Sequence, residues 1–265
     1  MKPLINAEFR RLLATRLWVA TLLAAALLGG GLIGLLALIG PENFDPPMPG
    51  LHTEAGVRAV LGFLGFTTFV PAAIGTLALT SEYRHRTVGF TFLFAPDRRR
   101  VLAAKLLTHG LAGMIYGLVL SGTAAAALFG AAAARGVDLG LPAGTIAGLL
   151  ARLAVAMAAY TLLGVGMGAL IRHQVAALCV VIGYLYGAEL LLIMIPGVRG
   201  LYPWLPGGAT AALTDFTAVT DALAQQLSSE PVRLLPPVAG ALILLGYTAL
   251  ASTAALLKPL RRDIS

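Results

Sequence analysis

The fold is decided by residues 17–39, LWVATLLAAALLGGGLIGLLALI, which contain no charged side chain and end at Gly40-Pro41. An α-helix rises about 1.5 Å per residue, so about 20 apolar residues cross the ~30 Å hydrocarbon core of a bilayer. The stretch is longer than the roughly 7–15 apolar residues of a signal peptide, and no small-residue cleavage pattern follows it. We therefore expect a transmembrane helix over residues 17–39.

Five further stretches have the same character. Pro71 predicts a kink in the second span, His109 is the titratable group of the third, Arg152 lies in the fourth and Glu189 in the fifth. The chain is thus expected to be an all-α polytopic membrane protein, one transmembrane domain covering residues 1–265. The expected spans are about 17–39, 59–80, 106–134, 143–171, 175–195 and 238–257.

Composition agrees with this fold class. Hydrophobic residues make up 58% of the chain and charged residues 12%, and the mean hydropathy is +0.86. Soluble domains carry about a quarter charged residues, so a soluble fold is excluded. The single cysteine, Cys179, excludes an intrachain disulfide. Its position in an apolar stretch predicts a small buried or lipid-facing side chain.

Charge distribution predicts the orientation. The net charge is +7, but the basic residues cluster between the hydrophobic stretches, which argues against nucleic acid as a partner. Fourteen of the nineteen Lys and Arg fall on one side of the predicted spans, four on the other, and Arg152 lies inside a span. The positive-inside rule then places both termini in the cytoplasm. Abundant Arg, Ala and Gly suggest a bacterial protein of the plasma membrane.

Two segments outside the spans have helical or interfacial character. Before the first span, Ile5, Phe9, Leu12 and Leu13 share one helical face. This predicts an amphipathic helix on the cytoplasmic leaflet, in contact with lipid; the alternative is a charged flank that only sets the topology. Between the fifth and sixth spans, residues 201–205 and 209–227 are too polar to span and predict short outer helices.

Motifs for chemistry are missing. None of the three lysines follows a glycine, so no P-loop is present. The four histidines form no H-E-x-x-H pair, no Gly-x-Ser-x-Gly occurs, and no paired carboxylates lie within the spans. We therefore predict no catalytic residue, no metal site, no cofactor and no enzymatic activity for this chain.

The main cytoplasmic loop, residues 81–105, reads SEYRHRTVGFTFLFAPDRRRVLAAK. It combines charges with Phe90, Phe92 and Phe94, which need a surface to bury them. Such a loop suits docking of a partner protein. The alternative is a stop-transfer cluster whose apolar part dips into the membrane interface.

This loop resembles the first cytoplasmic loop of bacterial type-2 ABC exporter permeases, in which an acidic, aromatic and basic segment ending in Thr precedes a Pro and a basic cluster that opens the third helix. The resemblance implies that 82–87 form a coupling helix seated in a separate ATPase subunit, which would bind ATP and Mg²⁺. It also implies two such ATPases and a second permease copy, identical or related. The coupling residues carried over are Glu82, Tyr83, Arg84, His85, Arg86, Thr87, Pro96 and Arg98.

The same resemblance assigns a substrate path to the second and fifth spans. The aromatic residues carried over are Phe63, Phe66, Phe69, Tyr184 and Tyr186; for each one singly, packing or lipid contact is the favoured explanation. Glu189 either lines this path or forms a latch near an outer gate. The alternatives are a structural ion pair, for which Arg152 is the candidate partner, and a side chain that extends to the outer interface. Small residues four apart predict close helix contacts at Gly30/Gly34, Gly113/Gly117, Gly164/Gly168 and Gly183/Gly187.

The function expected from the sequence is export of an amphipathic or hydrophobic substrate (a drug, lipid or peptide) from the cytoplasm, driven by ATP hydrolysis on partner subunits. Two alternatives remain open. One is a membrane anchor or sensor that recruits a cytosolic ATPase without transport. The other is export of a polysaccharide or lipid-linked substrate, as in some members of the family resembled.

Overall fold

The computed structural model describes residues 1–195, 198–217, 220–221 and 232–257. Regular structure in these residues is entirely helical, and no strand occurs among them. The first half of the chain forms α1 (Lys2–Ala14), α2 (Leu17–Ala26), η1 (Leu27–Leu32), α3 (Ile33–Ile39), η2 (Pro41–Asn43), α4 (Glu54–Gly62), η3 (Phe63–Thr68), α5 (Phe69–Arg84) and α6 (Val88–Phe94). The second half forms α7 (Arg98–Arg135), α8 (Ala143–Leu170), α9 (Gln174–Gly183), η4 (Tyr184–Ala188), α10 (Glu189–Met194), η5 (Arg199–Trp204), α11 (Pro206–Thr214) and α13 (Pro237–Leu257).

Six helical segments are long and apolar enough to cross a membrane, which confirms the number of spans predicted from hydropathy. The second and third are longer than predicted, because apolar residues alone were counted and the helices continue into charged residues at their ends. The six segments are Leu17–Ile39, Glu54–Arg84, Arg98–Arg135, Ala143–Leu170, Gln174–Met194 and Pro237–Leu257.

Three of these spans contain an irregular turn. A π-helix, η1, interrupts the first span where three glycines follow one another. A 3-10 helix, η3, lies immediately before the turn that contains Pro71. Proline has no N–H to donate to the carbonyl of Thr67, four residues earlier, so the regular α-helical bonding cannot continue there. A second π-helix, η4, precedes Glu189 in the fifth span.

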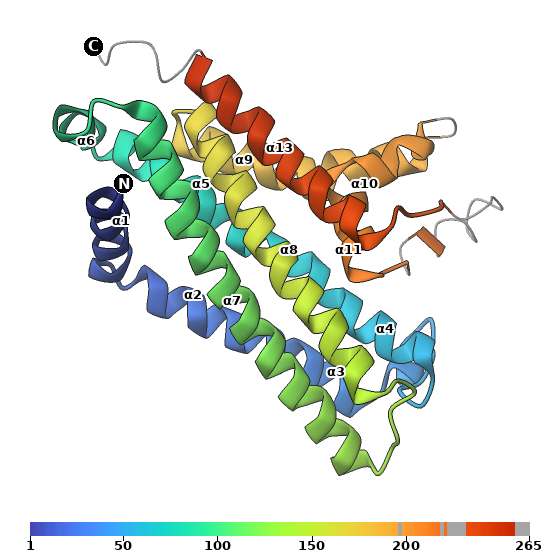
Figure 1. Cartoon of the computed structure of the whole chain (residues 1–265). Helices are drawn as coiled ribbons and strands as arrows, with labels where there is room; N and C mark the ends of the chain where they lie inside the picture. The colour runs from blue at the N-terminus through green and yellow to red at the C-terminus, as the bar shows by residue number, and fades with distance from the viewer. Residues whose placement is uncertain (196–197, 218–219, 222–231, 258–265) are drawn as a thin grey trace.

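The centre of the molecule is α8, which packs against α5, α7 and α13 (Figure 1). Glycines set how closely these helices approach. A Cβ on Gly164 would lie 2.1 Å from the carbonyl oxygen of Ala72, and one on Gly168 would lie 2.4 Å from that of Thr76. The helix backbones of α5 and α8 are therefore in direct contact.

The other predicted glycine pairs differ among themselves. Gly113 and Gly117 pack directly against α8, as predicted, and a Cβ there would lie 2.2 Å and 2.7 Å from its nearest atoms. Gly30 and Gly34 have ordinary contacts with α7, at 3.5 Å. A Cβ on Gly183 or Gly187 would meet no atom of the described chain within 4 Å. The first two pairs thus pack helices together, and the fifth span keeps an open small-residue face.

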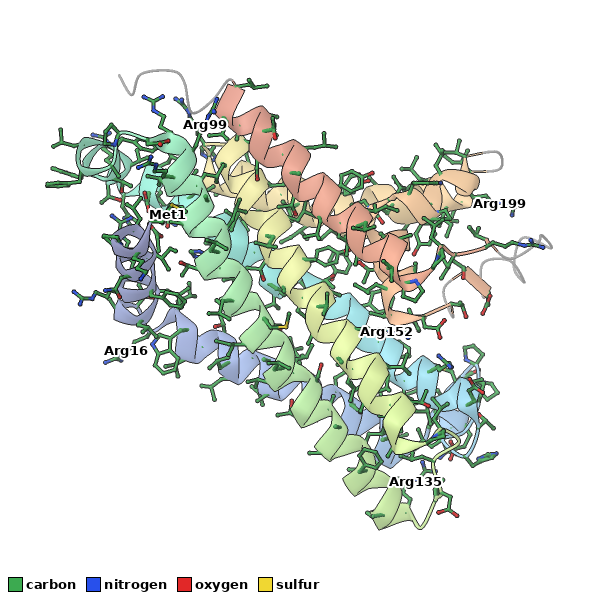
Figure 2. The ribbon with its side chains drawn as sticks, viewed as in Figure 1. Met1, Arg16, Arg99, Arg135, Arg152 and Arg199 are labelled. Atoms are coloured by element: carbon green, nitrogen blue, oxygen red, sulfur yellow. The ribbon has the colours of Figure 1, made fainter. Side chains whose placement is uncertain are left out.

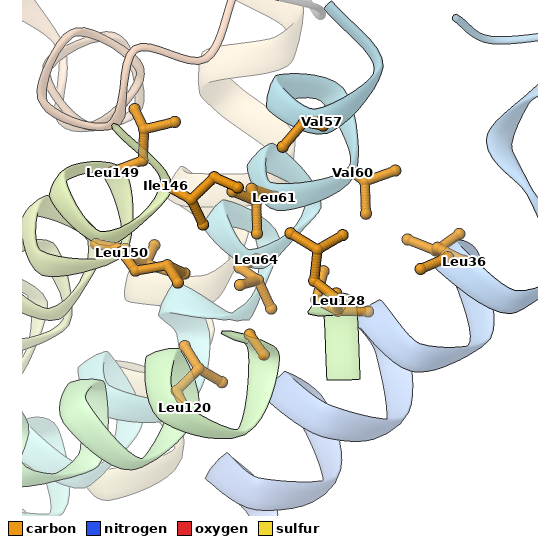
Figure 3. Packing of buried hydrophobic residues seen from close by; sticks show 14 of the residues in the cluster. Leu36, Val57, Val60, Leu61, Leu64, Leu120, Leu128, Ile146, Leu149 and Leu150 are labelled. Atoms are coloured by element: carbon orange, nitrogen blue, oxygen red, sulfur yellow. The ribbon is translucent and has the colours of Figure 1, made fainter. Parts of the chain in front are cut away.

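The largest core cluster lies where α3, α4, η3, α7 and α8 converge. Figure 3 shows leucine, isoleucine and valine side chains from these helices in mutual contact, among them Leu64, Leu120 and Ile146, which are fully buried. A second cluster joins α5, α8, α11 and α13, and a smaller third cluster packs Leu79, Leu102 and Val165 near α6.

One end of the helix bundle is rich in arginine, and we call it the basic end. It contains α1, the connection from α5 through α6 to α7, the end of α8 and the start of α9. Figure 2 shows Arg16 and Arg99 at this end, together with Met1. Arg135, Arg152 and Arg199 lie away from it. The segregation of basic residues expected from the sequence is therefore present in the arrangement of the helices.

Helix α1 packs onto the protein with a carboxylate at its most buried position. Of the apolar face predicted from the sequence, Ile5, Phe9 and Leu12 are half-buried, but the most buried residue of α1 is Glu8, at 6% exposure, one helical turn from Ile5 and Leu12. Leu13 is exposed. A carboxylate is thus the side chain that α1 inserts between its neighbours.

Between the fifth and sixth spans, the described residues form η5 and α11. In η5, Leu201 and Trp204 are exposed. Helix α11 is almost fully buried against α8 and α13. Of the helical stretch predicted over 209–227, the structure describes 209–217 and 220–221, and α11 ends at Thr214; the remainder lies outside the described residues.

Candidate functional site

A group of four charges, three of them buried and the fourth at the surface, lies at the basic end, between α1, α5 and α7. The ammonium group of Lys105 lies 2.9 Å from Glu8 Oε2 and 2.5 Å from Glu82 Oε1. It also donates a hydrogen bond to the carbonyl oxygen of Ala78, at 3.1 Å. Lys105 is 1% exposed, so its charge is neutralised inside the protein.

Arg11 completes the group from helix α1. Its guanidinium lies 2.6 Å from Glu82 Oε1 and 3.3 Å from Glu8 Oε1, and it donates to the hydroxyl of Thr91 at 3.1 Å. The Thr91 hydroxyl in turn donates to Glu82 Oε2, at 3.1 Å. Two acids and two bases therefore balance, and they connect α1, α5, α6 and α7. We call Glu8, Arg11, Glu82 and Lys105 the ion cluster.

The structure places the predicted coupling residues differently from the expected helix over 82–87. Glu82, Tyr83 and Arg84 form the last turn of α5. His85, Arg86 and Thr87 make the turn to α6, in which Arg86 has a φ of 56°. The separate short helix of this connection is α6, which begins at Val88. Glu82 faces inward, into the ion cluster.

Helix α6 carries the exposed apolar surface of the loop. Phe90, Leu93 and Phe94 are 65%, 73% and 85% exposed. Phe92 instead packs against the small core cluster, and the guanidinium carbon of Arg98 lies 5.3 Å from the centre of its ring. The side of α6 that turns away from the bundle is therefore apolar; we call Phe90, Leu93 and Phe94 the α6 surface.

The end of the loop is fixed by a helix cap. Pro96 precedes Asp97, whose carboxylate accepts hydrogen bonds from the backbone N–H groups of Arg99 and Arg100 at 3.1 and 3.3 Å. An aspartate in this position satisfies N–H groups that the first helical turn leaves free. Helix α7 therefore starts at Arg98, and its first three residues, all arginines, lie at the basic end.

A cavity of about 670 Å³ opens beside the ion cluster. Its walls come from α1, α2, α5 and α7 and are largely apolar, with Phe9, Trp18 and Ile115 among them. Glu82, Lys105 and His109 line its polar end. The hydroxyl of Tyr116, a buried residue of its lining, has no hydrogen-bond partner in the described residues. The cavity is thus amphipathic, apolar along its length and polar at one end.

A second, smaller cavity of about 90 Å³ contains Glu189, far from α6 (Figure 1). Glu189 is 2% exposed, and its Oε2 accepts a hydrogen bond of 2.6 Å from the backbone N–H of Gly207, in the first turn of α11. Its Oε1 has no hydrogen-bond partner. A Cβ on Gly207 would lie 2.1 Å from Oε2, so the close approach requires glycine at this position.

The structure brings together part of the predicted substrate path. Phe66, Tyr186 and Glu189 line the same small cavity. The hydroxyl of Tyr186 donates to the carbonyl oxygen of Phe66, and the rings of Phe69 and Tyr186 meet edge to face at 6.0 Å. The ring centres of Phe63 and Phe66 lie 6.1 Å apart. Neither Phe63 nor Tyr184 lines the cavity.

Several residues of this cavity were not predicted. Tyr160 is fully buried, and its hydroxyl donates to the carbonyl oxygen of Pro206 at 3.1 Å and accepts from Thr210 at 2.9 Å. Tyr202 and Phe216 also contribute to the lining. Burial and the nearby Glu189 raise the pKa of Tyr202, so its hydroxyl remains neutral. These residues come from α8 and from the segment after the fifth span, which no sequence pattern connects to Glu189.

The expected Glu189–Arg152 ion pair is not formed. Arg152 is exposed on α8, and within the described chain it makes no ion pair. Arg152 lies in the first half of α8, and its side chain is exposed. The described residues also contain no group of three or more His, Cys, Asp or Glu side chains that is placed to bind a metal ion.

Comparison of the chain with protein-family models and with curated proteins finds no match.

Proposed function

We propose that the chain is the transmembrane permease subunit of an ATP-driven exporter in a bacterial plasma membrane, with its basic end and both termini in the cytoplasm. The observation that supports this proposal is the ion cluster, which links α6, through the Thr91 hydroxyl, to two spans and to α1. A displacement of α6 would therefore be transmitted to α5, α7 and α1 together.

The driving force would come from two cytosolic ATPases that bind ATP and Mg²⁺, one on each of two permease copies. The α6 surface would bind the ATPase, because three large apolar side chains exposed at the basic end require a protein partner or a lipid surface. The turn 85–87 and the residues Tyr83, Arg84, Pro96 and Arg98 would surround this contact and set its position. Helix α1 would lie at the membrane interface, as a lever attached through Glu8 and Arg11.

The substrate would be amphipathic or hydrophobic, such as a drug, a lipid or a peptide. Support comes from the 670 Å³ cavity, whose long apolar walls and polar end match a molecule with a polar head and an apolar body. ATP-dependent closure of the ATPases would move the spans between an inward-open and an outward-open arrangement.

The test begins with binding of the ATPase. The chain is co-expressed with its ATPase, and the ATPase retained per purified permease is measured for the wild type and for Phe94→Ala. Truncation of a large residue at the centre of an interface costs about 2 kcal/mol, so the Kd for the ATPase should rise about 30-fold and less ATPase should be retained. The control is Leu201→Ala, which removes an exposed apolar side chain in η5, away from the basic end. Equal loss in both variants, or no loss in either, would contradict the proposal.

Transport separates the exporter from the alternative of an anchor or sensor. Inside-out vesicles containing the permease and its ATPase should accumulate a fluorescent amphiphile only when ATP is added. A complex that hydrolyses ATP but moves no amphiphile, lipid or glycolipid would instead support the sensor alternative.

A further inference from the structure

The small cavity around Glu189 contains a charge for which the described chain supplies no counter-charge. Glu189 is 2% exposed, and only its Oε2 is hydrogen-bonded, to Gly207 N at 2.6 Å. No described Lys, Arg or His forms an ion pair with it. A buried ionised carboxylate with one free oxygen is costly, so either a proton or a cation from outside must balance it.

The walls of the cavity distinguish between kinds of cation. Five aromatic side chains line it: Phe66, Tyr160, Tyr186, Tyr202 and Phe216. Aromatic rings attract cations electrostatically, and clusters of them bind quaternary ammonium groups. A metal ion would instead need several oxygen ligands.

The oxygens available for a metal are few. The Tyr160 and Thr210 hydroxyls are bonded to each other and to the carbonyl of Pro206, and the Tyr186 hydroxyl is bonded to the carbonyl of Phe66. Among the buried side-chain oxygens of the described chain that lack a partner, Glu189 Oε1 alone lines this cavity. One free carboxylate oxygen surrounded by rings fits an organic ammonium group better than a metal ion.

The local backbone supports a fixed position for this charge. Glu189 follows the π-helix η4, a distortion that recurs at functional sites, and its Oε2 is held at the N-terminal turn of α11, where backbone N–H groups favour negative charge. The carboxylate is therefore anchored through one oxygen while the other is left for a ligand.

We propose that the cavity formed by Glu189 and the five aromatic residues binds the ammonium group of an organic cation, with Glu189 as its counter-charge. That this cation is a transported substrate rests on the proposed function; that it binds does not. The proposal narrows the amphipathic substrate class to molecules with a cationic head.

The experiment measures binding of tetramethylammonium to the purified full-length chain in lipid nanodiscs, without ATPase or ATP, by equilibrium dialysis of the radiolabelled ion. The neutral isostere neopentane is the comparison ligand. We expect saturable binding of the cation that excess neopentane does not displace. Because no ATPase is present, this result is independent of whether the chain is coupled to ATP hydrolysis.

The decisive variant is Glu189→Gln, which keeps an oxygen to accept the hydrogen bond from Gly207 but removes the charge. Its affinity for tetramethylammonium should fall at least about 30-fold, as for truncation of one partner of a buried charge pair. The matched control is Glu54→Gln, at an exposed carboxylate at the start of α4, and it should bind as the wild type does.

A second pair of variants keeps the test informative if Glu189→Gln does not fold. Tyr202→Phe retains the ring, so its affinity for tetramethylammonium should stay within about threefold of the wild type. Tyr202→Leu removes the ring, so its affinity for the same ion should fall about tenfold. Absence of saturable binding by the wild type, full binding by Glu189→Gln, or equal effects of Phe and Leu at position 202 would overturn the proposal. Detection of a protonated Glu189 carbonyl band in infrared spectra that tetramethylammonium leaves unchanged would assign the site to a proton instead.

Discussion

At the scale of single residues, the ion cluster explains how charged side chains are tolerated inside an apolar bundle. Lys105 is almost completely buried, and it is accompanied by Glu8 and Glu82 within 2.9 Å. Arg11 supplies the second positive charge, so the group is neutral as a whole. Such a cluster stabilises only while it is complete, because removal of one member leaves its partners buried and uncompensated.

Replacement of Lys105 by Met should therefore destabilise the protein by about 3–5 kcal/mol. The substitution keeps the length of the side chain but leaves two acids opposite a single base, Arg11. Unfolding of the purified protein in detergent, followed by circular dichroism against denaturant, measures the change. Arg10→Met, at an exposed position of the same end, should stay within about 0.5 kcal/mol. A Lys105→Met variant as stable as Arg10→Met would show that the cluster carries no stability.

At the scale of helical elements, α8 is fixed by the glycines that let neighbouring backbones touch it. Among the glycines of α8 itself, Gly164 makes the closest contact, with the carbonyl oxygen of Ala72 on α5 where a methyl group would have to lie. Protein interiors are packed too densely for α5 to withdraw without loss of contacts along its length. A single methyl group added at Gly164 would therefore weaken the packing of α5 against α8 along the whole contact.

Gly164→Ala should lower the free energy of unfolding by about 1–3 kcal/mol, in spite of the better helix propensity of alanine. Gly148→Ala on the same helix meets no atom within 4 Å, so it should be neutral or stabilise by up to about 1 kcal/mol. Chemical denaturation of both variants measures the difference. The opposite order would mean that α5 and α8 are not packed as the structure has them.

The sequence predicts elements better than it predicts their contacts. Six spans followed from hydropathy, because membrane-spanning helices must be long and apolar whatever they pack against. The ion-pair partners of the charged side chains could not be predicted from hydropathy. Lys105 and Glu82 were visible in one loop motif, but Glu8 is far from both in the chain and was expected to face outward.

The Glu189 cavity is a second case in which a residue was predicted from the sequence but its contacts were not. A carboxylate inside an apolar stretch is conspicuous, and Glu189 was therefore a candidate from its position alone. Its surroundings depend on helical phase and on the fold of the segment after the fifth span, which brings Gly207 and Tyr202 to it. The position of a residue along a span can be counted from a sequence, but its contacts depend on how the helices pack, so the predicted pair of Glu189 with Arg152 is not found.

At the scale of the whole molecule, the fifth span is the least enclosed part of the bundle. Gly183, Cys179 and Val180 are exposed on α9, and no atom of the described chain approaches the glycine. Small residues at such a face let two helices approach closely. In the proposed two-copy assembly, this face would meet its counterpart on the second copy.

If two copies pair through α9, mild oxidation of membranes should link them through Cys179, the one cysteine of the chain. Cysteines are bridged only when their Cα atoms lie within about 7 Å. Non-reducing gel electrophoresis should show a dimer band that Gly183→Leu reduces at least about fivefold, by separating the helices. Gly246→Leu, at an equally open glycine of α13, is the control. A band of the same intensity in all three proteins would place the pairing surface elsewhere.

The backbone contact between α5 and α8 has one more consequence. Helices whose carbonyl groups touch glycine Cα atoms cannot slide past each other, so α5, α7 and α8 form a rigid frame. The degrees of freedom that remain belong to the first and fifth spans, each of which contains a π-helical turn and is enclosed on few sides. Because the ion cluster ties α6 to α5 and α7, a displacement of α6 would move this frame as one body relative to the first and fifth spans.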